Sequence, residues 1–172
     1  MTRTVAMLCL FVSGPLWAVS SLIERFSSGQ FPVPVEILKQ VEAEYAGKAQ
    51  ILEFEVERRG AGQRYDILLV EQSHRRRVIG LRLDGHGELL RKEVESPLNE
   101  DDALTALMAL QRRGIALSEL VQQGINAHSA YLVELSLDHD RGISYLELDL
   151  INTEGKHTLA YDLITGERLE DW

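Results

Sequence analysis

The chain is poor in cysteine and in positive charge, and it has no apolar run long enough to cross a membrane. Of its 172 residues only Cys9 is a cysteine, and 18 Lys and Arg stand against 27 Asp and Glu. Because Cys9 lies in a segment that we expect to be removed, the mature chain should have no disulfide, thiol catalyst or cysteine-based metal site. The excess of acids argues against broad nucleic-acid binding, which depends on neutralising phosphates.

Residues 1–20 have the pattern of a secretory signal peptide. Arg3 precedes an apolar run over residues 5–12, which is shorter than the ~20 residues that a membrane span needs. Gly14-Pro15 breaks the run, and Ala18-Val19-Ser20 has the small-x-small order of a cleavage site. Cleavage after Ala18, an uncleaved anchor and a buried N-terminal helix are the alternatives.

The remaining chain has the composition of a soluble, exported protein. Without Arg3 it holds 17 Lys and Arg against 27 Asp and Glu, a net charge of −10, while 45% of all residues are hydrophobic. Such a chain can bury a core as one compact domain or two very small ones. We expect it in a bacterial periplasm.

The sequence contains two copies of one unit, which we assign to residues 21–95 and 96–172. The first copy begins SLIERFSSGQFPVPVEILKQVEAEYAGK and the second begins DDALTALMALQRRGIALSELVQQGINAH. Each has a helical stretch, a glycine, a short apolar link and a second helical stretch. Helices are predicted over 100–113, ending at Gly114, and from Pro34 to Gly47, whereas Gly124 weakens the helix predicted near residues 118–125.

After the helices of each copy, apolar residues recur at every second position. In YLVELSLD, Tyr131, Val133, Leu135 and Leu137 share one face, and LEFEVER, YDILLVE and YLELDLI alternate in the same way. Alternation of this kind is typical of antiparallel strands with one buried face and one wet face. The predicted fold is α+β, with two tandem units that each pack an amphipathic helix on their own three- to four-stranded antiparallel sheet.

The order of these segments resembles the PepSY domain family. The second copy supplies YLVELSLD, YLELDL and the turn DLITGERL, from Asp162 to Leu169. The first supplies ILEFEVE, YDILLV and a shorter turn, Asp84 to Leu89, that lacks the threonine. The resemblance covers roughly residues 22–93 and 100–172. It implies a non-enzymatic role, because family members occur in propeptides that inhibit and chaperone secreted peptidases, or stand alone in the bacterial envelope, and some resemble partners of signalling systems.

No motif of a catalytic or cofactor site is present, so we assign no catalytic, cofactor-binding or metal-binding residue and no cofactor. The five histidines form no H-E-x-x-H motif. The densest ligand-like cluster is Asp138-His139-Asp140, which His128 could approach across a hairpin to hold a divalent ion weakly. The one basic run is His74 to Arg77, which could dock an acidic protein or a phosphate-bearing lipid head, so contact with a membrane surface is possible but weak.

Acidic residues on the strands are predicted to serve solubility. Glu53, Glu55 and Glu57 are spaced by two and share one wet face, and the Asp162 and Gly166 turn is predicted to be structural. We therefore expect an exported protein that acts by binding. Its partner would be an envelope peptidase or the sensor domain of a signalling protein, and the alternative is a periplasmic module for a small ligand or a divalent metal.

Overall fold

The computed structural model describes residues 16–59, 62–72, 77–94, 98 and 101–170. Its elements are, in chain order, α1 (Leu16–Ser27), α2 (Pro34–Tyr45), β1 (Ala49–Arg59), β2 (Gly62–Glu71), β3 (Val78–Asp84), β4 (Leu89–Val94), α3 (Asp101–Arg113), α4 (Leu117–His128), β5 (Tyr131–Asp140), β6 (Ile143–Asn152), β7 (Gly155–Asp162) and β8 (Arg168–Leu169). The predicted boundary between residues 95 and 96 lies outside the described residues, as do residues 1–15 of the predicted signal peptide. Residues 16–20 form the start of α1.

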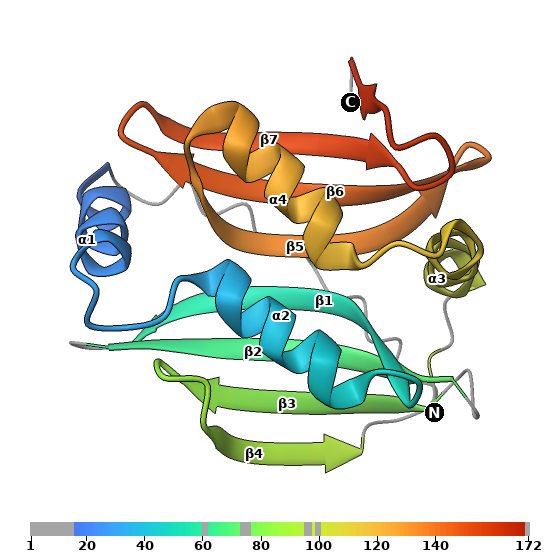
Figure 1. The fold of residues 1–172 in the computed structure, drawn as a ribbon, viewed down its shortest axis with the longest axis horizontal. Coiled ribbons are helices and arrows are strands. Elements are labelled where there is room, and N and C mark those ends of the chain that lie inside the picture. Colours follow the sequence, from blue (N-terminus) through green and yellow to red (C-terminus); the bar gives the residue numbers. More distant parts are fainter. Residues whose placement is uncertain (1–15, 60–61, 73–76, 95–97, 99–100, 171–172) are drawn as a thin grey trace, which may run out of the picture.

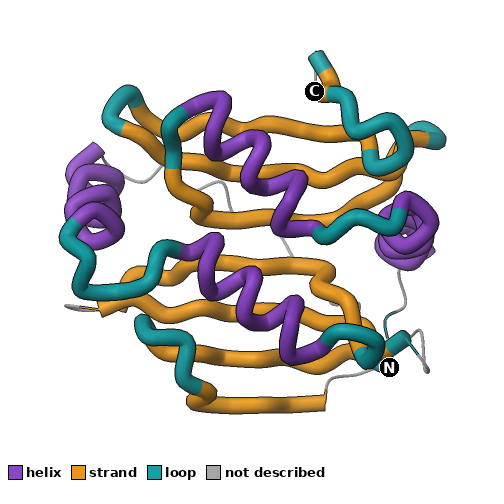
Figure 2. The backbone as a smooth tube through the Cα atoms, viewed as in Figure 1, coloured by secondary structure: helices purple, strands orange, loops and turns teal. Residues whose placement is uncertain are grey.

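All eight strands belong to one antiparallel sheet. Its strand order is β4-β3-β2-β1-β5-β6-β7-β8, so the two first strands of the halves meet at the centre. Because β1 and β5 run antiparallel, the halves are related by an approximate two-fold axis through this central contact. Helices α2 and α4 lie side by side on one face of the sheet, as Figures 1 and 2 show.

The predicted fold of two tandem helix-on-sheet units is wrong. The structure has one continuous sheet and one cluster of buried apolar side chains that draws on both halves. Helix α2, from the first half, packs on β5 as well as on β1 and α4. If each half formed a separate four-stranded sheet, β1 and β5 would be edge strands with unpaired backbone groups. Pairing β1 with β5 removes both of these exposed edges.

The central contact between β1 and β5 is a seam of three residue pairs. Glu53 lies opposite Ser136, Phe54 opposite Leu135, and Glu55 opposite Glu134. Phe54 and Leu135 are 0% and 1% exposed, so the middle of the seam is buried.

A register irregularity in each strand bounds this seam. One lies between Ile51 and Glu53 in β1 and the other between Leu132 and Glu134 in β5. Since bulges bend a strand and end its pairing, β1 and β5 diverge beyond both of these points.

Helices α1 and α3 occupy the two places where β1 and β5 diverge. Helix α3 contacts β5, β6 and β1, and it buries Ala106 and Leu107. At the other end, the Phe26 ring of α1 lies 5.2 Å from the Tyr131 ring of β5, and Arg58 of β1 donates to the Ser21 hydroxyl at 3.2 Å. The helices therefore complete a core that the short seam alone would leave open at both ends (Figure 1).

The helices predicted from the local sequence are confirmed, with one change. Helix α3 ends at Arg113 before Gly114, and α2 ends at Tyr45, with Gly47 at a positive φ of 71°. Gly124 does not weaken α4, which runs unbroken past it. A Cβ on Gly124 would lie 3.1 Å from a methyl group of Leu148, so this glycine lets α4 approach the sheet closely.

The strand pattern is confirmed except at the start of β5. Leu132 is fully buried, while Tyr131 and Val133 are only partly buried, because the bulge before Glu134 reverses the faces of the first residues. Leu135 and Leu137 point into the core as predicted. The alternation therefore holds only on the C-terminal side of the bulge.

The two Asp-containing turns have the predicted structural role. The Asp162 carboxylate accepts from the backbone N–H groups of Ile164 and Thr165 at 2.6 and 2.9 Å, and Gly166 has a φ of 75°. In the first copy, Asp84 accepts from the backbone of His86 and Glu88, both at 2.9 Å. Each turn closes a hairpin by satisfying donors that the reversing chain leaves unpaired.

Glu42 joins the helices of the two halves. The residue before α4 is Ala116, which has no side-chain acceptor for the first N–H groups of the helix. The carboxylate of Glu42, on α2, accepts instead from the N–H groups of Leu117 and Ser118 at 2.7 and 3.2 Å. A negative charge at a helix N-terminus is also favoured by the helix dipole.

Replacing Glu42 by alanine should destabilise the fold by about 1–2 kcal/mol, the usual cost of losing a helix cap. Urea unfolding followed by circular dichroism measures the change. Glu44→Ala, on the exposed side of the same helix, is the matched control and should stay within about 0.5 kcal/mol of the parent. Equal losses in both variants would contradict the capping role.

Candidate functional site

The sheet face opposite α2 and α4 carries a groove of about 540 Å³. Residues of β1 to β6 line it, together with Ala103 of α3, and Glu53, Glu55 and Ser136 of the seam lie in it. Helices α2 and α4 cover the other face, and α3 borders the groove. The buried faces of the central strands β1 and β5 pack on the helices, so their alternating polar residues are left to form the groove.

The groove is predominantly acidic. Its charged lining consists of seven carboxylates and two guanidinium groups, namely Glu53, Glu55, Asp66, Glu93, Glu134, Asp138 and Glu147 with Arg82 and Arg91. Both arginines already contact acids: Arg82 binds Asp66 at 2.6 Å, and Arg91 binds Glu93. The remaining negative charge attracts cations and raises their local concentration at this face.

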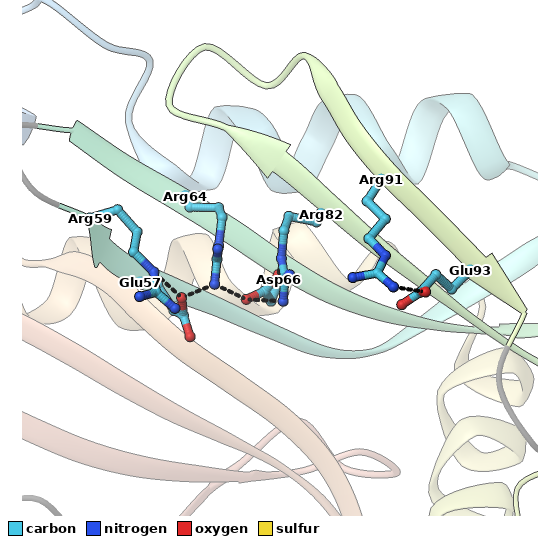
Figure 3. Close-up of polar contacts among 7 residues, drawn as sticks. All are labelled: Glu57, Arg59, Arg64, Asp66, Arg82, Arg91 and Glu93. Carbon is cyan, nitrogen blue, oxygen red and sulfur yellow. Dashed lines mark hydrogen bonds and ion pairs between the residues drawn. The ribbon is translucent and has the colours of Figure 1, made fainter.

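A row of alternating charges crosses the first half of the sheet at the edge of the groove (Figure 3). Arg64 contacts Glu57 and also lies 3.2 Å from Asp66, which in turn binds Arg82. Glu57 accepts from Arg59 at 3.1 Å. The acids of this row are therefore neutralised by neighbours.

Glu55 and Glu134 lie directly opposite each other across the seam. Among the described residues neither carboxylate has a hydrogen bond or an ion pair. Both side chains are exposed on the sheet face, yet the surrounding strands remove enough water that desolvation is the main reason why the pKa of each is raised. Nearby acids raise both pKa values further, Glu57 and Asp66 for Glu55, and Asp149 and Glu55 for Glu134.

The Asp138-His139-Asp140 cluster does not meet His128. Asp138 accepts from the Tyr145 hydroxyl at 3.1 Å, and His139 contacts Ser144 at 2.9 Å, so both are held by β6. Burial and the Asp138 charge raise the pKa of Tyr145. His128 lies instead beside His157, 5.4 Å between ring centres, at the other end of β5, so its suggested approach to the cluster is wrong. In the described part of the chain, no three His, Cys, Asp or Glu are placed to hold a metal ion.

The basic run contributes one residue to the described structure. Residues 74–76 lie outside it, and Arg77 is exposed, with its guanidinium 3.6 Å from the Glu71 carboxylate. The three glutamates of β1 share a face as predicted, but Glu57 has arginine partners that the sequence spacing did not reveal. The sequence did not predict this groove, because the patterns of β1 and β5 do not show that the two strands are neighbours.

Comparisons with known proteins give one structural likeness. No protein-family model and no curated protein matches the chain. A crystal structure of a predicted lipoprotein from Clostridium difficile 630 is similar at 16% identity and a TM-score of 0.43, over 82% of this chain and 93% of that one. A TM-score this low does not establish a shared fold. Within the described helices, none has the length and apolar character to span a membrane.

Replacing Glu134 by glutamine should stabilise the protein at neutral pH by a few tenths to about 1 kcal/mol, the size of a cross-strand like-charge repulsion. A raised pKa means that the folded state binds the proton more tightly than the unfolded state. Ionisation therefore lowers stability as the pH rises through the raised pKa, and below the ordinary value of 4.5 this penalty is absent.

Thermal melts of the parent and Glu134→Gln at pH 7 and at acidic pH test this expectation. The gain should be present at pH 7 and should disappear as the pH falls below about 4. Glu154→Gln, in the exposed β6–β7 turn, is the control and should show no pH-dependent gain. A constant gain at every pH would contradict the electrostatic origin.

Proposed function

We propose that the protein is an exported, non-enzymatic binding protein of the PepSY type that regulates or inhibits an envelope peptidase, or serves as the partner of a sensor protein. The observation that carries the proposal is the groove of about 540 Å³ on the uncovered sheet face. The signal-peptide pattern and the PepSY-like order of segments support export and a binding role.

The shape of the groove suits a protein segment. It extends over residues from six neighbouring strands, which gives a broad and shallow site rather than an enclosed one. Apolar atoms of Leu52, Leu68 and Ala103 lie between the charged groups, so a bound segment could bury apolar surface as well as form ion pairs.

The charge of the groove selects the chemistry of the partner. Among the described residues neither Glu55 nor Glu134 forms an ion pair, and a lysine or arginine placed between them would relieve their repulsion. We therefore propose that the bound segment is basic. The two carboxylates have similar surroundings and pKa values raised in the same direction, which does not match the divergent acid and base of a hydrolytic pair.

Site-specific photo-crosslinking in intact cells tests the proposal. A photoreactive amino acid replaces Ser136 in the groove or, as the matched control, the exposed Gln123 on α4. We expect a discrete envelope protein to be crosslinked from Ser136 and not from Gln123. Crosslinking of the same proteins from both positions, or of none from the groove, would contradict the proposal.

The crosslinked protein then provides a functional measurement. If it is a peptidase, adding the purified chain should lower its activity, and Glu55→Lys with Glu134→Lys should weaken the inhibition at least ~10-fold, since about 1.4 kcal/mol corresponds to a factor of ten. Raising the salt concentration should weaken binding of the parent chain in the same direction, because exposed charges are screened.

A further inference from the structure

The two edges of the sheet differ in a way that the approximate two-fold relation between the halves does not explain. β8, at one edge, has two residues, whereas β4, at the other, has six. Natural sheets usually protect their edges, and a very short last strand is one such protection. The β4 edge lacks that protection, and what it carries instead is an irregularity at Leu90, an extra residue between Leu89, opposite Leu83, and Arg91, opposite Arg82.

β4 is also the most apolar exposed strand of the described chain. All six of its residues are exposed, and Leu89, Leu90 and Val94 are 57%, 61% and 57% exposed. They are three of the four large apolar side chains exposed among the described residues. On one side β4 pairs with β3, and within the described part of the chain no strand pairs with its other side, toward which backbone groups alternate.

We propose that β4 is a self-association edge, at which two copies of the chain pair antiparallel and join their sheets across a two-fold axis. The order of its side chains carries the choice of a second copy as the occupant. When Lys92 is placed on the axis, Arg91 lies opposite Glu93 of the other copy, and Val94 lies opposite Leu90, the extra residue at the irregularity of β4. Apolar residues then meet apolar residues and cations meet anions, each twice.

Shifting the register by one residue removes the apolar match in one direction, where Lys92 faces Glu93 and Arg91 faces Val94, and the charge match in the other. With Arg91 opposite Lys92, two cations face each other and Leu90 faces Glu93, and both arrangements are unfavourable. In the matched register the like charges are the two copies of Lys92 on the axis. The Lys92 ammonium is directed away from the edge, because it donates to the Tyr45 hydroxyl at 3.2 Å and lies 5.1 Å from the centre of that ring.

The proposed dimer contact overlaps the binding groove only at one end. Arg91 and Glu93 lie at one end of the groove, whereas the seam acids Glu55 and Glu134 belong to the two central strands. Pairing through β4 uses an isologous contact, which closes at two copies and leaves no further free β4 edge. The expected assembly is a dimer with a groove on each copy.

Reciprocal charge swaps test the register directly. Arg91→Glu and Glu93→Arg each place like charges opposite each other in the homodimer, and each should weaken dimerisation at least ~10-fold, or about 1.4 kcal/mol. A mixture of the two single variants should form a heterodimer, because Glu at 91 then faces Arg at 93 and Glu at 93 faces Arg at 91. Sedimentation equilibrium of the chain, purified as the cell processes it, measures the affinities.

The double variant Arg91→Glu with Glu93→Arg keeps the ion pair within β4. It therefore serves as the control for loss of folding in the single variants. It should dimerise with itself and fail to exchange with the parent chain, as native mass spectrometry can show. Arg59→Glu, which alters the similar Glu57–Arg59 pair on β1, is the matched control and should leave dimerisation unchanged.

Three results would overturn the proposal. A parent chain that stays monomeric at every accessible concentration shows that the edge is not used between copies. Charge swaps without effect on a dimer place its interface elsewhere. Assemblies that grow beyond two copies are incompatible with a closed contact of this kind.

Discussion

The structure depends on the three-residue seam between β1 and β5. Phe54 and Leu135 form its buried centre, and a bulge in each strand prevents the ladder from extending further. The short ladder has two effects at once. It merges the sheets of the two halves, and it lets the strands diverge, so that α1 and α3 can enter the core at the two ends. Helices α2 and α4, linked by the Glu42 carboxylate, then cover the seam from one side.

The same seam determines the character of the opposite face. Because Phe54 and Leu135 point toward the helices, their neighbours on each strand point away from them, and Glu55 meets Glu134 in the middle of an acidic groove. A cross-strand pair of acids is unfavourable for folding, and its location at the centre of the sheet follows from joining two similar halves. The buried centre of the seam and the charge of the groove are thus set by alternate residues of the same two strands.

The features that the sequence predicted correctly are those that depend on residues close together in the chain. The end of α3 at Gly114, the Asp162 turn and the alternation of β6 all follow from residues a few positions apart. The joining of the sheets could not be predicted, because LEFEVER alternates in the same way in a central strand and in an edge strand. Glu42 looked like an ordinary polar residue of an amphipathic helix, since its partners lie 75 and 76 residues further on.

The order of the two halves along the chain has a consequence for its synthesis. Residues up to the end of β4 are synthesised first. Until β5 is synthesised, the edge of β1 that forms the seam has no neighbouring strand. Closing the long loop between the two strands is slow relative to local folding. If β1 pairs instead with β5 of another molecule, the two molecules exchange halves, which is a characteristic misfolding route of chains built in this way.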